Sequence, residues 1–147
     1  MAPRLNRVEF ALLFFCISTF LASPVFSQQK KTSPTGSTEK KLTLLNAVTC
    51  EGIQEFAPLN EAIVFSISIG KVYCFSDFEP VPEKTFIYHN WYFLDKLIAR
   101  VKLTLKPPRW RTYSTIQLRE ADKGPWRVEI TDSKGQGFKV LRFSITD

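Results

Sequence analysis

The sequence predicts an all-β fold built from about eight antiparallel strands. Apolar and polar residues alternate over most of the chain after Leu42, and turn residues interrupt this alternation at short intervals. No segment in this region keeps a helical period for more than about two turns. This combination is typical of antiparallel sheets in which one face of each strand is buried.

The alternation places the individual strands. The expected ranges are 42–50, 63–69, 71–78, 85–93, 97–105, 112–120, 126–130 and 141–145. Residues 97–105 have one apolar and one mostly polar face, which indicates a half-buried strand. A turn at 132–137 is expected to join the last two strands into a hairpin. The short connections at 95–96 and 121–124 favour antiparallel pairing of the strands that they join.

About eight strands in a little over 100 residues fit an immunoglobulin-like sandwich of two antiparallel sheets. A small closed barrel is the alternative, because it also buries one face of every strand. One hydrophobic core is expected, since a domain of about 100 residues buries enough surface to fold alone.

The first 27 residues have the features of a secretory signal peptide. Arg4 and Arg7 precede an apolar run at 10–21, which at about a dozen residues is short of the roughly 20 that a membrane-spanning helix needs. We expect cleavage after Ser27, a periplasmic or secreted mature protein, and no stable membrane span after cleavage. An uncleaved anchor is the alternative. Cys16 lacks the preceding small residues that lipoprotein processing requires, so no lipid anchor is expected.

Residues 28–41 contain Lys, Ser, Thr, Gly and Pro but no apolar side chain, which predicts a flexible polar linker before a domain at 42–147. The whole chain has a formal net charge of +6, whereas residues 42–147 contain 14 basic and 12 acidic side chains. The domain therefore lacks the extended positive field that nucleic-acid binding uses, and no nucleic-acid partner is expected.

Cys50 and Cys74 are the two cysteines of the expected mature chain, in a compartment where thiols oxidise. We predict a structural disulfide between them, because each lies in phase with apolar residues of its strand and they are too far apart in sequence for a typical redox pair. Two separate buried thiols are the alternative. Two cysteines and one histidine without close spacing do not complete a zinc site, so neither a metal nor a cofactor is expected.

The first group of candidate site residues lies in the strand at 85–93. His89, the only histidine of the chain, shares a face with Trp91. The imidazole either belongs to the core, bonded to a neighbouring polar group, or contacts a ligand at the edge of an aromatic platform. General-base catalysis is a further alternative, although no nucleophile with a positioned acid can be identified around His89.

The second group lies in the segment at 107–114. Alternation points Trp110 inward and Arg109, Arg111 and Tyr113 outward. Two outward arginines that flank an aromatic ring can hold a carboxylate, a phosphate or a sugar through forked donors and stacking. A solvated strand face, with arginine stems covering apolar surface, is the alternative.

These segments together resemble a known family. The motifs are Cys50, Cys74-Phe75, His89-x-Trp91-Tyr92, Trp110-Arg111-Thr112-Tyr113-Ser114 and Gly124-x-Trp126-x-Val128. Their combination resembles the bacterial family called domain of unknown function 2914, over residues 42–147. The resemblance implies an exported or membrane-tethered β domain without an established activity, substrate or cofactor. This chain has Thr115-Ile116 where a Ser-Lys pair commonly follows the serine, so a ligand role of that lysine does not carry over.

We expect a non-catalytic exported module that binds a glycan or another envelope component through His89, Trp91, Arg109, Arg111 and Tyr113. The surplus of Trp, Tyr and Arg beyond the needs of one core face motivates this expectation. One alternative is a structural or assembly partner that adds an edge strand to another envelope protein. An enzyme of unknown reaction is the other.

Overall fold

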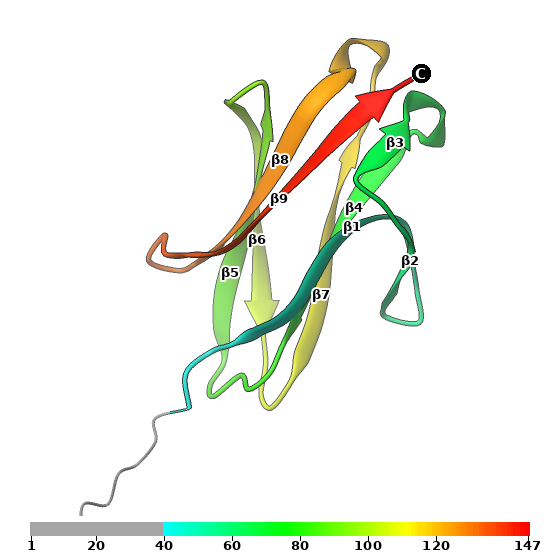
Figure 1. The fold of residues 1–147 in the computed structure, drawn as a ribbon. Coiled ribbons are helices and arrows are strands. Elements are labelled where there is room, and N and C mark those ends of the chain that lie inside the picture. Colours follow the sequence, from blue (N-terminus) through cyan, green and yellow to red (C-terminus); the bar gives the residue numbers. More distant parts are fainter. Residues whose placement is uncertain (1–39) are drawn as a thin grey trace, which may run out of the picture. The chain divides into compact units, whose positions relative to one another are not determined.

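The computed structural model describes residues 40–147, which form two packed β-sheets (Figure 1). Sheet A has the strand order β2-β1-β4-β7, and sheet B has the order β3-β9-β8-β5-β6. All pairs are antiparallel except β3 with β9. The predicted two-sheet sandwich is confirmed, with nine strands, and the fold is not a closed barrel. The predicted signal peptide at 1–27, Cys16 and the linker up to residue 39 lie outside the described residues.

The elements follow one another along the chain with these bounds: β1 (Leu44–Gln54), β2 (Ala57–Glu61), β3 (Val64–Ser66), the 3-10 helix η1 (Ile67–Ile69), β4 (Lys71–Phe78), β5 (Thr85–Phe93), β6 (Lys96–Leu105), β7 (Trp110–Gln117), the 3-10 helix η2 (Glu120–Asp122), β8 (Gly124–Asp132) and β9 (Gly137–Thr146). The strands expected at 71–78 and 85–93 have these same bounds in the structure. The segment expected as a strand at 63–69 is extended only in β3 and then turns into η1. Gly70 ends this helix with a φ of 74°, which a residue without a side chain adopts without cost.

The core lies between the inner faces of the two sheets. The alternation of β5 and β8 points Ile87, Trp91, Val128 and Ile130 into it, and all four are fully buried. The ring of Phe143 on β9 packs edge-on against Trp91, with centroids 6.0 Å apart. Each large apolar side chain buried in this way stabilises the fold by about 1.5–3 kcal/mol.

Two short connections have different outcomes. The connection at 95–96 joins the paired strands β5 and β6, as predicted. The connection that includes η2 instead carries the chain from β7 in sheet A to β8 in sheet B, so the predicted pairing of those strands is wrong. The Asp122 carboxylate accepts from the Arg119 N–H (2.7 Å), and the Asp122 carbonyl accepts from the Trp126 indole (2.8 Å). These bonds stabilise a compact crossing turn that the apolar alternation does not reveal.

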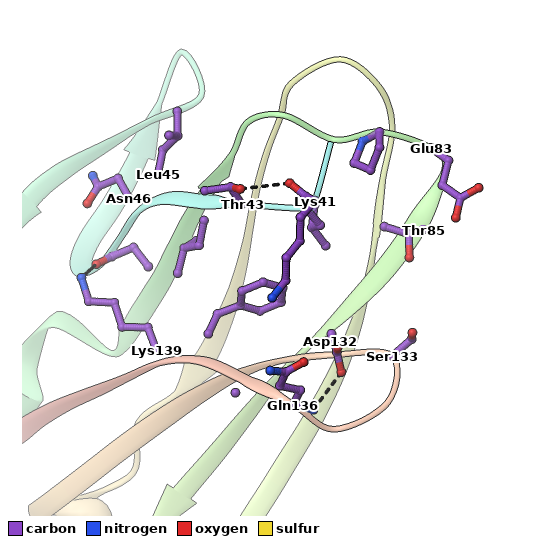
Figure 2. A pocket seen from close by; sticks show the side chains of 16 residues that line it. Lys41, Thr43, Leu45, Asn46, Glu83, Thr85, Asp132, Ser133, Gln136 and Lys139 are labelled. Carbon is purple, nitrogen blue, oxygen red and sulfur yellow. Dashed lines mark hydrogen bonds between the residues drawn. The ribbon is translucent and has the colours of Figure 1, made fainter. Parts of the chain in front are cut away.

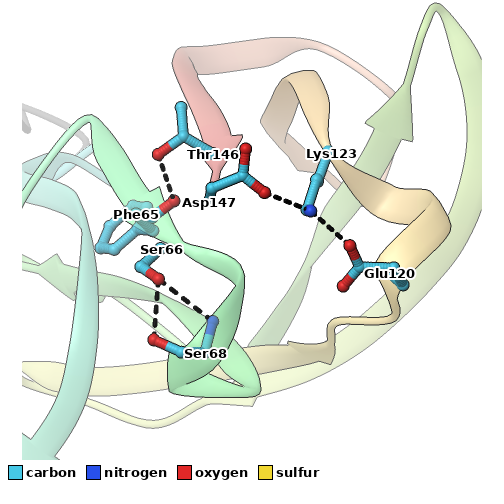
Figure 3. A network of polar contacts seen from close by, with 7 residues as sticks. All are labelled: Phe65, Ser66, Ser68, Glu120, Lys123, Thr146 and Asp147. Atoms are coloured by element: carbon cyan, nitrogen blue, oxygen red, sulfur yellow. Dashed lines mark hydrogen bonds and ion pairs between the residues drawn. The ribbon is translucent and has the colours of Figure 1, made fainter.

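The same end of the sandwich contains a network of polar contacts (Figure 3). Lys123 forms ion pairs with Glu120 and with Asp147 after β9. The Thr146 hydroxyl donates to the Phe65 carbonyl of β3 (3.5 Å). These contacts connect the crossing turn with β9, and β9 with the short strand β3.

A bulge in β1 changes which residues of that strand face the core. Leu44 is opposite Phe78, but the register then shifts so that Asn46 is opposite Asp77. Because one extra residue reverses the phase of a strand, Ala47 faces inward after the bulge.

The predicted disulfide is not present in the structure. Cys50 is opposite Tyr73 and Cys74 is opposite Thr49, so the two thiols point to opposite faces of sheet A. Both are free and fully buried, and burial raises the pKa of both thiols. The prediction was wrong because the bulge after Leu44 changes the phase of Cys50, and the alternative of two buried thiols is the observed state.

The β1–β2 hairpin, at the edge of sheet A, bends away from the strands β4 and β7 of the same sheet (Figure 1). Its tip residue Phe56 lines a common cavity with Arg109, Trp110 and Arg111 at the start of β7. The hairpin thereby brings a segment far away in the sequence next to the predicted arginine cluster.

Candidate functional site

Three of the predicted ligand-contacting residues lie together on sheet A. Arg109 precedes β7, and Arg111 and Tyr113 project from its outer face, where Arg111 is opposite Asp77 of β4. Tyr113 is 43% exposed, and its ring packs against Tyr73 with centroids 6.0 Å apart. This part of the outer face therefore presents both guanidinium and phenol groups to solvent, as the alternation predicted.

Asp77 holds the two arginines in place. The Arg109 Nε donates to its Oδ1 (3.0 Å), and the Arg109 Nη2 donates to its Oδ2. The Arg111 Nε donates to the same Oδ2 (3.3 Å). Although Asp77 is only 6% exposed, the hydrogen bond from Arg109 lowers the pKa of its carboxyl group, and Arg111 adds to this effect. The carboxylate is therefore charged and fixes the direction of both guanidinium groups.

The cluster is close to electrically neutral. Glu79 lies 3.4 Å from the Arg109 Nη1, so two carboxylates face two guanidinium groups. Among residues 40–147, the terminal Nη atoms of Arg111 make no hydrogen bond with a side chain. Asp77 and Glu79 offset most of the attraction that the two arginines would exert on an anion, whereas a hydroxyl-bearing ligand can accept from the Arg111 donors without carrying a charge.

A surface cavity of about 390 Å³ adjoins the cluster, and Phe56, Arg109, Trp110 and Arg111 line it. Phe56 is 67% exposed. Trp110 is partly buried against the core, as its predicted inward direction requires, and it also lines the cavity. Two aromatic residues and Arg111 thus border one space.

The turn that presents Phe56 has an unusual backbone. Glu55 and Phe56 have φ values of 48° and 57°, in the left-handed region that costs a residue with a side chain about 1–2 kcal/mol. The sequence did not point to Phe56, because this turn lacks the Asn and Gly residues that normally reveal a two-residue hairpin.

The other two predicted ligand residues, His89 and Trp91, do not reach the surface. Both are fully buried on the inner face of β5. The His89 ring lies 2.9 Å from the Ser76 hydroxyl at Nε2 and 2.8 Å from the Ser114 hydroxyl at Nδ1. The Trp91 indole donates to the same Ser114 hydroxyl (3.0 Å). Their predicted ligand contact is corrected to the alternative of a core histidine bonded to neighbouring polar groups.

This buried network connects the two sheets, since Ser76 and Ser114 belong to sheet A and His89 and Trp91 to sheet B. Burial lowers the pKa of His89 to about 3, so the imidazole is neutral at physiological pH. The hydroxyl groups that could act as nucleophiles are enclosed with it, because Ser76 and Ser114 are 0% and 5% exposed. The arrangement fits a structural role better than one that needs substrate access.

A larger cavity of about 610 Å³ lies between the beginning of β1 and the β8–β9 turn (Figure 2). None of the predicted site residues lines it. Its walls include Lys41, Phe138 and Lys139.

No three His, Cys, Asp or Glu side chains within residues 40–147 lie close enough together to hold a metal ion. This part of the chain has no helix whose length and apolar character would allow it to span a membrane.

Comparison with known proteins gives a family match and a structural likeness. Residues 84–145 match the model of a family described as protein of unknown function (DUF2914). The motifs of β5, β7 and β8 lie in this range and those around Cys50 and Cys74 do not, so the resemblance is confirmed for 84–145 and not from residue 42 onward. No curated protein matches the chain.

The structure is similar to that of an immunoglobulin-like protein from Pseudomonas aeruginosa, with a TM-score of 0.51 and 9% sequence identity. The similarity covers 74% of this chain and 99% of that protein. At this level of identity the likeness shows the fold alone. Residues 84–145 are therefore similar to the family of unknown function DUF2914, and they lie within a two-sheet sandwich that is similar to an immunoglobulin-like protein.

Proposed function

We propose that this domain is a non-catalytic binding module that holds a neutral, hydroxyl-rich glycan in the cavity bordered by Phe56 and Trp110. The observation that carries the proposal is that Phe56, Trp110 and Arg111 line one cavity of about 390 Å³, while only the Nε of Arg111 is bonded to Asp77. Aromatic faces supply apolar contact area, and a few placed donors orient a ligand in such a pocket.

The ion-pair cluster supports binding by holding its donors still before a ligand arrives. Asp77 fixes the Nε side of Arg111 and leaves its outer nitrogens for the ligand. A guanidinium group that is already oriented loses less conformational entropy on binding than a free side chain. Tyr113 lies two residues farther along β7, at a distance of about 7 Å, where it can contact a second sugar ring.

The signal-peptide pattern in residues 1–27 supports an exported location for this activity. We therefore place the glycan in the cell envelope. The envelope glycan would be recognised by the neutral faces and hydroxyl groups of its sugar rings.

The test is a titration of the full-length protein with neutral oligosaccharides released from purified bacterial surface polysaccharide. Tryptophan fluorescence reports on the site, since Trp91 and Trp126 are 0% and 3% exposed whereas Trp110 lines the cavity. We expect Phe56→Ala and Arg111→Ala each to weaken binding at least tenfold without loss of fold. Lys102→Ala, on the opposite sheet, is the matched control and should leave affinity unchanged. Equal binding by all three variants would contradict the proposal.

Salt dependence distinguishes a neutral ligand from an anionic one. Because the cluster carries little net charge, the dissociation constant for a neutral glycan should change less than about twofold between low and high salt. Binding only to acidic polysaccharide, with a steep loss of affinity in salt, would show that the arginines act as an anion site and would overturn the neutral-glycan proposal.

A further inference from the structure

The sandwich has an open seam between β1 and β9. β2 pairs with β1 only from Cys50 onward, and β3 pairs with β9 only from Ser144 onward. The first part of β1 and the first part of β9 therefore each have an unpaired edge within residues 40–147. The cavity of about 610 Å³ opens at this seam, and Leu45, Ala47 and Lys139 are among the residues that line it (Figure 2).

The backbone groups at the edge of β9 point outward from sheet B. The Ser144 N–H points away from β8 and donates to the Ile63 carbonyl (2.9 Å). Because backbone groups of alternate residues point to the same side of a strand, the N–H and C=O groups of Val140 and Arg142 face the same way. These two residues lie before the part of β9 that β3 covers, so they form a short strand edge without a backbone partner in the described chain.

A lysine side chain spans the seam between β9 and β1. The Lys139 Nζ donates to the Ala47 carbonyl across the gap (2.9 Å). A lysine at an edge is a common protection against unwanted strand pairing. A single part-buried side-chain contact of this kind can be exchanged for another acceptor without disturbing the ladder between β8 and β9.

The surroundings of the edge favour a polypeptide with a defined pattern. Leu45 and Val140 are 53% and 48% exposed, which provides apolar contact for β-branched side chains. Lys139 and Arg142 form no ion pair within residues 40–147. Lys139 is on the inner face of β9 and Arg142 is on the outer face. In an added strand of alternating pattern, acidic side chains on the outer face would complement Arg142, and the β-branched side chains would face the seam.

We infer that this seam receives an extended segment of a partner polypeptide, which adds to the free edge of β9 beside β3. The segment has acidic and β-branched side chains in alternation and no proline, and its backbone pairs with Val140 and Arg142. The seam and the proposed glycan cavity are lined by different residues, so either can be correct without the other.

Two other occupants fit the charges less well. A second copy paired through β9 would bring its own Lys139 and Arg142 toward the same two cations. Residues 28–39 of this chain contain two lysines and one glutamate, and are thus net basic. Both occupants are distinguished from a partner segment by the experiment.

The probe is an acetylated and amidated hexapeptide of alternating Val and Glu, added to the isotope-labelled full-length protein. We expect saturable binding and at least tenfold slower hydrogen exchange of the Val140 and Arg142 amides. The matched control peptide has the same side chains with alternate backbone amides methylated, which removes its donors. Equal binding of the methylated peptide, or no binding of the parent peptide, would overturn the inference.

The matched protein variants are Val140→Pro and Val140→Thr. Proline removes only the N–H that points away from β8, and edge strands tolerate it, so Val140→Pro should fold and lose peptide binding while Val140→Thr retains it. If Val140→Pro fails to fold, Arg142→Pro provides the same test. Retained binding by a folded proline variant would overturn the inference.

A concentration-dependent dimer that the proline variant abolishes would also overturn it, in favour of a second copy. Persistent protection of the Val140 amide without peptide, lost on removal of residues 1–39, would assign the edge to this chain's own segment.

Discussion

At position 89 an imidazole lies between two serine hydroxyls in a site from which water is excluded. Burial lowers its pKa to about 3, against about 6.5 in an unfolded chain. The unfolded state therefore binds a proton more readily below pH 6.5, and stability falls as the pH falls from 6.5 toward 3. We predict a loss of about 2 kcal/mol between pH 7 and pH 5, which urea denaturation at the two pH values will measure.

The control for this prediction is His89→Gln, which cannot titrate. Since His89 is the only histidine of the chain, this variant should have nearly equal stability at pH 7 and pH 5. Asp77 affects stability only at lower pH, because the pKa of its carboxyl group is lowered from the ordinary 3.8. The stability that this carboxylate contributes is lost only as the pH falls below that value. A pH dependence that persists in His89→Gln would contradict the role assigned to the imidazole.

Ser114 satisfies two buried groups at once, the His89 ring and the Trp91 indole. We predict that Ser114→Ala will lower the free energy of unfolding by about 1–3 kcal/mol, because a buried polar group without a partner keeps its full desolvation cost. Chemical denaturation will measure the change. Ser133→Ala, in the exposed β8–β9 turn, is the control and should be within about 0.5 kcal/mol of the wild type. An equal effect of both substitutions would contradict the prediction.

The sequence predicts which residues of β5 share a face, but not which face is inside. His89 and Trp91 share one face and Tyr88 and Tyr92 the other, so both faces are aromatic. On the outer face Arg100 and Arg127 lie over the rings of Tyr88 and Tyr92, 3.8 and 4.0 Å from their centroids. Because these cations come from other strands, local alternation does not show that the outer face is the one covered by charge.

Among the elements, the β1–β2 hairpin contains the residue that sequence analysis missed. We predict that Phe56→Gly will raise the free energy of unfolding by about 1 kcal/mol, since glycine adopts the φ of 57° without steric cost. The same substitution should abolish glycan binding. Thermal and chemical denaturation will measure the gain, and Phe56→Ala, which keeps the strain, should show none. A loss of stability in Phe56→Gly would mean that the ring packs more than its exposure indicates.

The elements that could be predicted are those with uninterrupted alternation. β4 and β5 have the expected bounds because each is long and regular and its ends coincide with turn residues. β2 was missed because Pro58 interrupts its pattern, and proline is compatible only with an edge strand such as this one. The bulge after Leu44 was missed because a bulge is a property of the pairing between two strands, which a single segment does not specify.

At the scale of the whole sandwich, Cys50 and Cys74 are not cross-linked within residues 40–147, and both thiols are free. We predict that an unreduced digest of the denatured, alkylated protein will contain Cys50 and Cys74 in separate, singly alkylated peptides. The thermal midpoint should not change when a reductant is added, since no covalent constraint is removed. Recovery of a peptide in which Cys50 and Cys74 are linked would contradict the structure. The control is alkylation without denaturant, which should be slow because both thiols are buried.

The two-sheet architecture could be predicted from the number and patterning of the strands, but the assignment of strands to sheets could not. The turn at η2 is as short as a hairpin connection, yet it joins β7 to a strand of the other sheet. Its geometry depends on the indole of Trp126, which bonds back to the Asp122 carbonyl. The candidate site also could not be predicted from local sequence. Phe56 and Arg111 line one cavity only because the β1–β2 hairpin bends and brings them together.

The buried bonds among Ser76, His89, Ser114 and Trp91 also restrict how one sheet can slide over the other. Apolar side chains keep most of their contact area when one sheet shifts slightly over the other. An interface that is only apolar therefore permits several similar relative positions of the two sheets. Four polar groups with fixed directions do not, because displacement by one residue would leave each of them without a partner. The network therefore gives the sandwich a single alignment, and replacing all four groups by apolar ones should yield a domain that still folds but no longer selects one placement of its layers.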